Sequence, residues 1–308
     1  MLQQICFSSP LKKISPFAFS QSSITEIFIP PHVTHICKNA FYLCNKLRRV
    51  EIPTNSELSF IGDSSFFETS IESIYIPSHV KVISKYTFFE CERLKCIEFP
   101  EDSELQEIKC AFSNTLIENL MIPSQVSKLD DDWCNGMENI KKVTIMSNNM
   151  YFKNFEGNEK VIIGKSNLNN NEYDSLVFVG RDITHFYIPP NIKIISPYAF
   201  AQSSITEVFI HPNVTHICDK AFFSCRKLRR VEIPTNSELV SIGQNSFSGS
   251  SIESISIPSK VTQISFYALT SCYKLRIIQF DAYIDPESIT KKIFLNDKRV
   301  DFMIPAKH

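Results

Sequence analysis

The sequence predicts a β-rich solenoid, in which short coils stack along one axis and each buries its apolar face against its neighbours. The first observation is a duplication: residues 14–99 recur as residues 195–280, at a constant offset of 181 without a gap. The second is a shorter frame inside each copy, I/L-x-x-I/V-x-I/F followed by a position that is usually proline, which recurs every 22 to 24 residues. Such a period indicates stacked repeats, because one unit cannot bury its own apolar face.

The first half of each coil has the pattern of a short strand. Segments such as ITEIFIP (24–30) and LRRVEIP (228–234) alternate apolar and variable residues and are rich in β-branched side chains. The proline that follows ends the strand. Because the strands of successive coils stack side by side in the same direction, we expect a parallel sheet along one face.

The second half of each coil predicts the opposite face. Its pattern is V-x-x-I-x-x-x-A-F-x-x-C, as in residues 33–44, with a variant S-E-L-x-x-I-G-x-x-x-F around Gly62. Ala-Phe followed three residues later by Cys suits one turn of α-helix or 3₁₀-helix, with the Phe packed inward between coils. By the same reasoning, Trp133 replaces Ala-Phe in the core of a degenerate coil. The expected fold is therefore an α/β solenoid with a parallel sheet on one face and short helical or 3₁₀ turns on the other.

The repeat frame also predicts how the chain is divided. We expect a first repeat block (1–145), a non-repeat spacer (146–182), a second repeat block (183–281) and a C-terminal cap (282–308).

The spacer and the ends have their own patterns. In the spacer, YFKNF and KVIIG flank the turn residues EGN and predict a hairpin, which is followed by an Asn-rich loop over 167–171. The cap predicts a short helix opened by Asp285 and Pro286 and a last strand in VDFMIP. Residues 1–10 match no repeat, so the first coil is expected to be incompletely capped.

The composition excludes several classes of protein. Hydrophobic residues make up 43% of the chain and charged residues 21%, which supports a buried core and argues against disorder. The net charge of −1 provides no long-range attraction for nucleic acid or a bulk membrane surface. No secretory signal and no apolar run long enough to span a membrane is visible. We therefore expect no nucleic acid partner and no membrane insertion, and by these features alone a cytoplasmic protein.

The ten cysteines are expected to be structural. Cys44, Cys91, Cys225 and Cys272 occupy one slot of the repeat, and slots that recur every second coil lie far apart along a stack. We interpret them as small buried apolar residues, consistent with a reducing compartment, rather than as disulfide partners or metal ligands.

No arrangement of residues predicts catalysis. Gly164-Lys165-Ser166 resembles the end of a phosphate-binding loop, but Glu159 stands where that loop needs its first glycine. His32, His35 and Cys37 have a spacing that a metal could use, yet the second copy carries Asn213 in place of His32. We therefore predict a protein that is not an enzyme and that holds no metal and no cofactor.

The outward positions of the strands are the candidate binding surface. In the L-x-x-L-x-L frame the first, fourth and sixth positions point into the core, so the third and fifth point outward. Aromatic, arginine and methionine side chains in these two rows match the composition of protein-binding hot spots. The candidate set is Phe28, Arg49, Glu51, Tyr75, Met121, Tyr187, Phe209, Arg230 and Glu232.

A structural interpretation of the charged residues stands beside the functional one. Glu26 beside Arg49, and Glu207 beside Arg230, would form cross-strand ion pairs that only keep the sheet soluble. We favour this structural role for the charges and leave both roles open for the aromatic residues.

The frame L-x-x-I-x-I-P-x-x-V-x-x-I-x-x-x-A-F-x-x-C resembles the leucine-rich repeat of the BspA-like surface antigens, a family of anaerobic bacteria that is greatly expanded in protist parasites. The resemblance covers 11–145 and 183–280, and the spacer at 149–183 also resembles the one that protist members place between repeat blocks. It implies a right-handed curved solenoid with a parallel sheet lining one face. It also implies a cell-surface protein that acts in adhesion or protein recognition.

Two functional hypotheses follow from the sequence. The first is a non-catalytic solenoid that binds a protein partner through the outward rows and acts at the cell surface, as the resemblance implies. The second is an intracellular structural scaffold that self-associates through its open N-terminal edge, which the missing signal, the free thiols and the incomplete cap favour.

Overall fold

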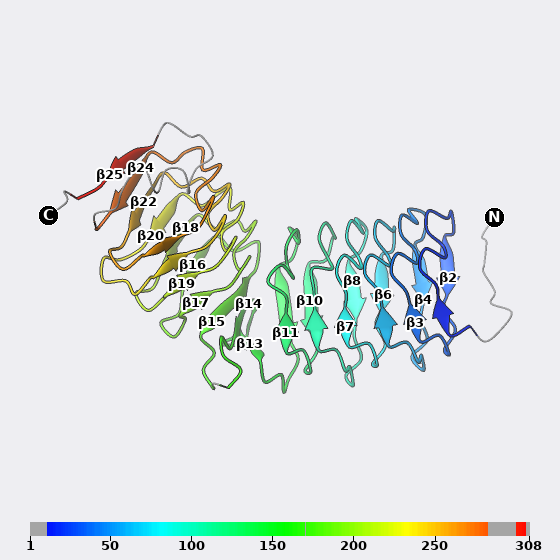
Figure 1. The fold of residues 1–308 in the computed structure, drawn as a ribbon. Helices are drawn as coiled ribbons and strands as arrows, with labels where there is room; N and C mark the ends of the chain where they lie inside the picture. The colour runs from blue at the N-terminus through cyan, green and yellow to red at the C-terminus, as the bar shows by residue number, and fades with distance from the viewer. Residues whose placement is uncertain (1–10, 170, 283–299, 306–308) are drawn as a thin grey trace. The chain divides into compact units, whose positions relative to one another are not determined.

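The computed structural model describes residues 11–169, 171–282 and 300–305. The chain divides into two compact units, Met1–Asn154 and Phe155–His308, and each is a stack of short β-coils (Figure 1). The predicted incomplete cap at 1–10 and the predicted helix at Asp285 and Pro286 lie outside the described residues.

In unit 1 the L-x-x-I-x-I frame forms the strands that we call the front sheet. They pair in parallel as β2 with β4, β6 with β8 and β10 with β12. Their bounds are β2 (Glu26–Phe28), β4 (Arg49–Glu51), β6 (Ser73–Tyr75), β8 (Cys96–Glu98), β10 (Asn119–Ile122) and β12 (Lys142–Ile145).

A second set of two-residue strands in unit 1 forms the side sheet. It comes from the V-x-x-I half of each coil and is also parallel, with strand orders β1-β3-β5 and β7-β9-β11. The bounds are β1 (Lys13–Ile14), β3 (His35–Ile36), β5 (Phe60–Ile61), β7 (Val82–Ile83), β9 (Glu107–Ile108) and β11 (Lys128–Leu129).

Unit 2 repeats both sheets. Its front sheet has the order β16-β18-β20-β22-β24-β25, all parallel, and includes the strand predicted in VDFMIP as β25. The bounds are β16 (His185–Tyr187), β18 (Glu207–Phe209), β20 (Arg230–Glu232), β22 (Ser254–Ile257), β24 (Ile277–Phe280) and β25 (Asp301–Met303).

The side sheet of unit 2 continues from the spacer. Its strands β15, β17, β19, β21 and β23 are parallel, whereas β14 pairs antiparallel with β15. The bounds are β14 (Asn158–Gly164), β15 (Ser175–Val179), β17 (Ile194–Ile195), β19 (His216–Ile217), β21 (Ser241–Ile242) and β23 (Gln263–Ile264). The spacer also contains β13 (Phe152–Phe155), which is separated from β14 by the turn residues Glu156 and Gly157.

The predicted helical face is wrong: the described residues contain neither α-helix nor 3₁₀-helix. In its place each coil has a turn arc, in which backbone N–H groups donate alternately within the coil and to the next coil. Ala40 N donates to Cys37 O at 3.2 Å, whereas Phe41 N donates to Ser65 O at 2.8 Å in the following coil. Asn39 and Leu43 have positive φ values of 57° and 59°. A helix needs negative φ throughout, so these residues turn the chain and direct every second N–H along the stack.

The inward phenylalanines form a ladder along the core, as predicted. Rings of successive coils stack with nearly parallel planes, at 5.1 Å between the centroids of Phe41 and Phe66 and 5.0 Å between those of Phe222 and Phe247. Trp133 is 2% exposed, which confirms its place in the core. Stacked rings fill the width between coils, so each aromatic residue supports the coil before and after it.

The repeated cysteine is buried in every described coil that carries it, as predicted, and it also makes a polar contact that the sequence did not predict. The thiols of Cys44, Cys91, Cys225 and Cys272 donate to a phenylalanine carbonyl oxygen in the preceding coil, at 2.8–3.1 Å. Burial raises the pKa of Cys91 and of Cys225 to about 11. Both thiols are therefore protonated near neutral pH and serve as hydrogen-bond donors rather than nucleophiles.

The glycine of the S-E-L-x-x-I-G variant is required by a close approach between coils. A Cβ on Gly62 would lie 2.5 Å from the backbone nitrogen of Lys38, and a Cβ on Gly243 would lie 2.5 Å from that of Asp219. These two glycines are equivalent across the offset of 181. Any side chain here would push the coils apart.

Arg181 in the spacer supplies hydrogen-bond donors to the first repeat coil of unit 2. Its side chain is 3% exposed, and its guanidinium donates to the carbonyl oxygens of Ala199 at 3.0 Å and Tyr198 at 3.2 Å. The carbonyl oxygen of Ala199 thus accepts two hydrogen bonds, one from the Arg181 guanidinium and one from the backbone N–H of Val179 at 2.9 Å. Satisfied carbonyls are needed where a buried turn arc begins.

Candidate functional site

The front sheets display the predicted candidates. In most of the three-residue strands a buried middle residue lies between two more exposed ones, for example Ile27 between Glu26 and Phe28, because successive side chains of a strand point to opposite faces; in β16 the middle residue, Phe186, is partly buried. The outward orientation of the candidates is therefore confirmed, and a role in binding stays a prediction. The candidates divide between the units: Phe28, Arg49, Glu51, Tyr75 and Met121 lie in unit 1, and Tyr187, Phe209, Arg230 and Glu232 lie in unit 2.

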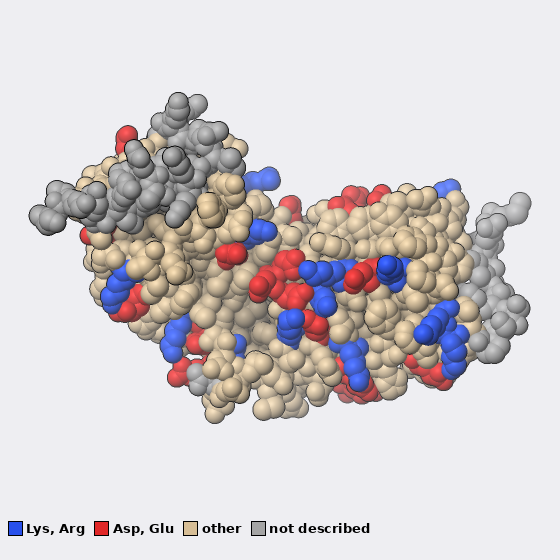
Figure 2. Space-filling model, in the orientation of Figure 1, with Lys and Arg blue, Asp and Glu red and all other residues tan. Residues whose placement is uncertain are grey.

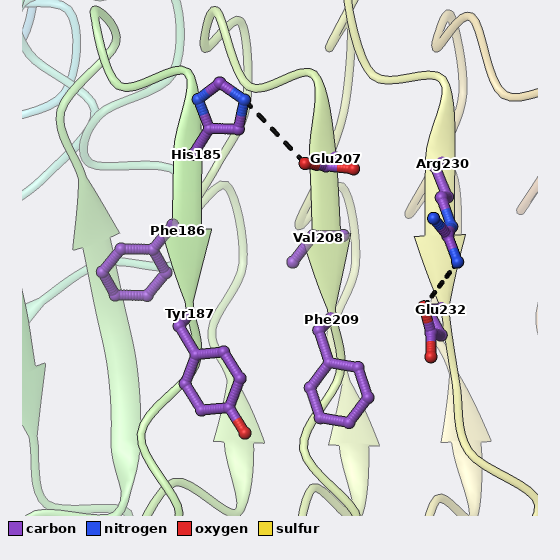
Figure 3. Close-up of a pocket in the computed structure, with 8 residues that line it drawn as sticks. All are labelled: His185, Phe186, Tyr187, Glu207, Val208, Phe209, Arg230 and Glu232. Atoms are coloured by element: carbon purple, nitrogen blue, oxygen red, sulfur yellow. Dashed lines mark hydrogen bonds and ion pairs between the residues drawn. The ribbon is translucent and has the colours of Figure 1, made fainter.

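The four candidates of unit 2 come together around one hollow of about 330 Å³ on three adjacent strands, β16, β18 and β20 (Figure 3). The strand register places Tyr187 beside Phe209 and Phe209 beside Glu232, and in the parallel row His185 beside Glu207 and Glu207 beside Arg230. One row is thus mainly aromatic, and the other consists of a histidine, a carboxylate and a guanidinium. Val208 and Phe186 form the floor between the rows.

Tyr187 and Phe209 form the aromatic part of this hollow. Their ring centroids lie 5.6 Å apart and their planes differ by only 9°. Figure 3 shows the two rings side by side on the open face of the sheet. Tyr187 is 64% exposed, so its ring is open to solvent.

The charged side chains pair differently from the prediction. Arg230 lies in register with Glu207, but its guanidinium contacts Glu232 two residues along its own strand, at 3.0 Å. Arg49 likewise contacts Glu51 at 3.3 Å rather than pairing across the sheet with Glu26. Residues i and i+2 share one face of a strand, so a long arginine side chain reaches along it. The expected cross-strand pairs are therefore wrong.

The candidates of unit 1 are more dispersed. Phe28 is 40% exposed on β2, and no other ring stacks on it within the described residues. Tyr75 on β6 is half-buried, and burial together with the nearby Asp102 carboxylate raises its pKa. Met121 projects from β10 and is 43% exposed. These residues occupy separate pairs of strands rather than one hollow.

His185 and Glu207 line the hollow but were not among the candidates. Glu207 Oε1 lies 3.9 Å from His185 Nε2, and Thr184 Oγ1 lies 3.0 Å from His185 Nδ1. Both residues occupy the outward third position of the frame, so the signal was present in the sequence.

The other residues screened for chemistry have structural partners. Ser166 of the Gly-Lys-Ser segment bonds Asp174 through its N–H at 2.9 Å and its hydroxyl at 2.8 Å, so neither of these two donors is free for a phosphate. His35 Nδ1 lies 2.8 Å from the Thr34 hydroxyl. In the described part of the chain, no three His, Cys, Asp or Glu side chains are placed to hold a metal ion.

The charges elsewhere are mixed. Figure 2 shows Lys and Arg interspersed with Asp and Glu over the visible face, without a broad region of one sign. Ion pairs such as Lys128 with Asp130 at 3.2 Å and Lys193 with Glu172 at 3.0 Å account for part of this pattern. A helix long and apolar enough to cross a bilayer is absent from the residues that the structure describes.

Comparison with family models identifies the repeat. A model described as a BspA type leucine rich repeat region, which contains 6 copies of the repeat, matches residues 1–92, 59–171 and 171–301. These matches cover nearly the whole chain. No curated protein is similar enough to this chain to count as a match.

Solved structures share the fold at low sequence identity. The pneumococcal vaccine antigen PcpA is 20% identical, with a TM-score of 0.80 over 88% of this chain and 68% of its own. A leucine-rich cell surface protein from Faecalibacterium prausnitzii is 22% identical, with a TM-score of 0.72 over 95% of this chain and 82% of its own. A leucine-rich repeat protein from Eubacterium ventriosum is 20% identical, with a TM-score of 0.73 over 94% and 75%.

Proposed function

The chain belongs to the BspA-type leucine-rich repeat family, and from this premise we propose that it is a non-catalytic solenoid that binds a protein partner through the front sheet of unit 2. Its binding site is the hollow over β16, β18 and β20. Unit 1 contributes Phe28, Tyr75 and Met121 as secondary contacts.

One observation supports this proposal most. Tyr187 and Phe209 present adjacent rings at the open surface, whereas the ladder phenylalanines of the same unit, such as Phe200 and Phe222, are fully buried. Leaving large apolar side chains in water is costly, and exposed aromatic residues ringed by charged ones are typical of protein-binding hot spots. The flanking Arg230 and Glu232 supply the polar rim that such sites have.

The location that we propose is the cell surface, in a role of adhesion or recognition. Two proteins of the same fold are described as a vaccine antigen and a cell surface protein, and this supports the proposal by analogy. Labelling intact cells with a membrane-impermeant reagent tests it. Labelling only after lysis would contradict a surface role.

The test of partner binding begins with a photo-crosslinking residue at position 187. We expect it to capture a protein that is then purified and bound to the intact chain in solution. In that purified system Y187A/F209A should weaken the affinity at least about tenfold, because alanine removes both anchors. Stability should change little, since both side chains are partly exposed.

Two matched controls accompany this experiment. F266A/Y273A removes one Phe and one Tyr from exposed turn-arc positions of the same unit, and we expect less than about a twofold effect. F28A/Y75A removes one Phe and one Tyr from the front sheet of unit 1 and should have an intermediate effect. Equal affinity for Y187A/F209A and the unmutated chain would contradict the proposed site.

The alternative, an intracellular scaffold that assembles through the N-terminal edge, is supported by the strand order. Within the described residues β1 and β2 are terminal strands of their sheets, and a terminal strand offers unpaired N–H and C=O groups to another chain. Sedimentation over a wide concentration range tests this. A constant monomer mass would exclude it, whereas end-to-end growth would favour it over the surface role.

A further inference from the structure

We infer that the hollow of unit 2 receives a cationic side chain, arginine or lysine, from an extended segment of the protein partner. This inference rests on the proposed function and adds the chemistry of the ligand. It depends on the rings, on the two carboxylates beside them and on the weakness of the contacts that these carboxylates make within the chain.

The two rings are open to a cation. The chain already uses cation–π contacts elsewhere: Lys165 lies 5.3 Å from the centroid of Tyr173, and Arg181 lies 5.0 Å from that of Phe178. In the described part of the chain no cation lies over Tyr187 or Phe209. Because the faces of aromatic rings carry negative partial charge, this pair of rings offers a surface that attracts a ligand cation.

Two carboxylates lie beside the same rings. Glu207 precedes Phe209 by two residues on β18 and points to the same face, and Glu232 on β20 is the register neighbour of Phe209. Both side chains are more than half exposed. Figure 3 shows Glu207 along the strand from Phe209 and Glu232 on the neighbouring strand. A cation placed over Phe209 would therefore be within reach of both acidic groups.

The contacts that these carboxylates make within the chain are weak. Glu232 is held by Arg230 at 3.0 Å, but both side chains are in solvent, where an ion pair contributes little. Glu207 lies 3.9 Å from His185, which is beyond a normal hydrogen bond. Both acidic groups can turn toward a partner at small cost, so they complement a cation rather than an anion.

The size and charge of the hollow favour a side chain on a protein segment. Among its lining residues are two carboxylates against one guanidinium, so an anionic ligand would meet net repulsion. A volume of about 330 Å³ has room for one long side chain. The remainder of the segment would cross β16, β18 and β20, and the exposed third-position residues would contact its backbone.

The experiment measures binding of three labelled peptides to the full chain: alternating arginine and glycine, alternating glutamate and glycine, and alternating serine and glycine. We expect the arginine peptide to bind at least about tenfold more tightly than either of the others. E207Q/E232Q, which keeps the shape of both side chains, should weaken this binding about tenfold. Y187L/F209L keeps the apolar bulk but removes the rings and should weaken it about fivefold.

The matched control is E26Q/E51Q, which removes the equivalent two charges from unit 1, where Phe28 has no stacked ring. It should change binding of the arginine peptide by less than about twofold. Equal loss in both double glutamine variants would mean general charge attraction and would overturn the inference. Tighter binding of the glutamate peptide, or binding of a neutral polysaccharide such as dextran that Y187L/F209L abolishes, would also overturn it.

These outcomes are separable from failure of the proposed function. If the crosslinked partner depends on Tyr187 and Phe209 but is unaffected by E207Q/E232Q, the site binds a protein without using a cation. If neither pair matters to the partner, the proposed function itself is wrong.

Discussion

The front sheets of the two units have the same frame and share one Phe, one Arg and one Glu at equivalent positions, yet they present different surfaces. Phe28, Arg49 and Glu51 of unit 1 recur as Phe209, Arg230 and Glu232 of unit 2. Both arginines pair with the glutamate two residues further on. Unit 2 adds Tyr187, which stacks on Phe209, whereas unit 1 places Tyr75 on the far side of Glu51.

The two copies show which positions of the repeat can change without altering the fold. The core residues Phe41 and Phe222, like Gly62 and Gly243, are the same in both copies because a change would break contact with two neighbouring coils. The outward fifth position tolerates Tyr75 in one copy and Ser256 in the other. A change at such a position alters the binding surface without altering the fold.

The strongest test of the shared frame is removal of one ring from each ladder. F41A in unit 1 and F222A in unit 2 should each lower the free energy of unfolding by about 3–5 kcal/mol, because each leaves a cavity between stacked rings. Urea unfolding measures the loss. Markedly unequal losses would show that the two ladders are not equivalent.

The buried thiols should make both units sensitive to alkaline pH. Since the pKa of Cys91 and of Cys225 is raised from 9.0 to about 11 in the folded state, the unfolded thiol loses its proton first. The stabilisation is complete below about pH 9 and is lost as pH rises toward 11, on the order of 2 kcal/mol for each thiol.

Unfolding midpoints in urea between about pH 8 and about pH 10.5 measure this dependence. C91A should reduce the fall of the urea midpoint with rising pH for the unfolding of unit 1. C225A should reduce the same fall for the unfolding of unit 2. An unchanged slope in both variants would show that other groups cause it.

Adding one methyl group where coils meet should also destabilise both copies. G62A and G243A should cost about 1–3 kcal/mol, because the new Cβ would lie 2.5 Å from a backbone nitrogen. G157A is the control, since no atom lies within 4 Å of its new Cβ. The expected cost of G157A is about 1 kcal/mol, and it comes only from the positive φ of 75°, which an alanine adopts with strain. A larger effect at Gly157 would contradict the argument from close approach.

The smallest effect is expected at the exposed ion pairs. E51Q and E232Q should each change the free energy of unfolding by less than about 1 kcal/mol, because exposed pairs are screened by water. Unfolding measured at low and high salt provides the check. A large loss for E232Q alone would mean that this pair stabilises the hollow.

Several features could be predicted from the sequence because they depend on local spacing. The period, the parallel register and the inward Phe41 follow from an apolar frame that each coil must share with the next. The outward direction of Tyr187 and Phe209 follows from strand alternation. The helical turn was predicted wrongly, since Ala-Phe-x-x-Cys fits one helical turn as well as it fits an arc that bonds along the stack.

Other features depend on which residues meet across coils. The sequence does not reveal that Arg181 would be buried against the carbonyls of Ala199 and Tyr198, because the spacer lies outside the repeat. It also does not reveal that Arg230 would pair along its strand, since Glu207 and Glu232 are both within reach of a long side chain. When two acidic partners lie at similar distances from an arginine, the packing of the surrounding side chains decides which one it contacts.

The sequence by itself determined a stack of β-coils with buried isoleucine and phenylalanine, because each repeat buries its apolar residues only by packing against the next repeat. Only the tertiary structure decided that the far face is a turn arc bonded from coil to coil, and that Tyr187, Phe209, Glu207 and Glu232 surround one hollow. These features depend on hydrogen bonds and side-chain contacts between residues more than 20 positions apart. Such contacts exist only after the coils have stacked.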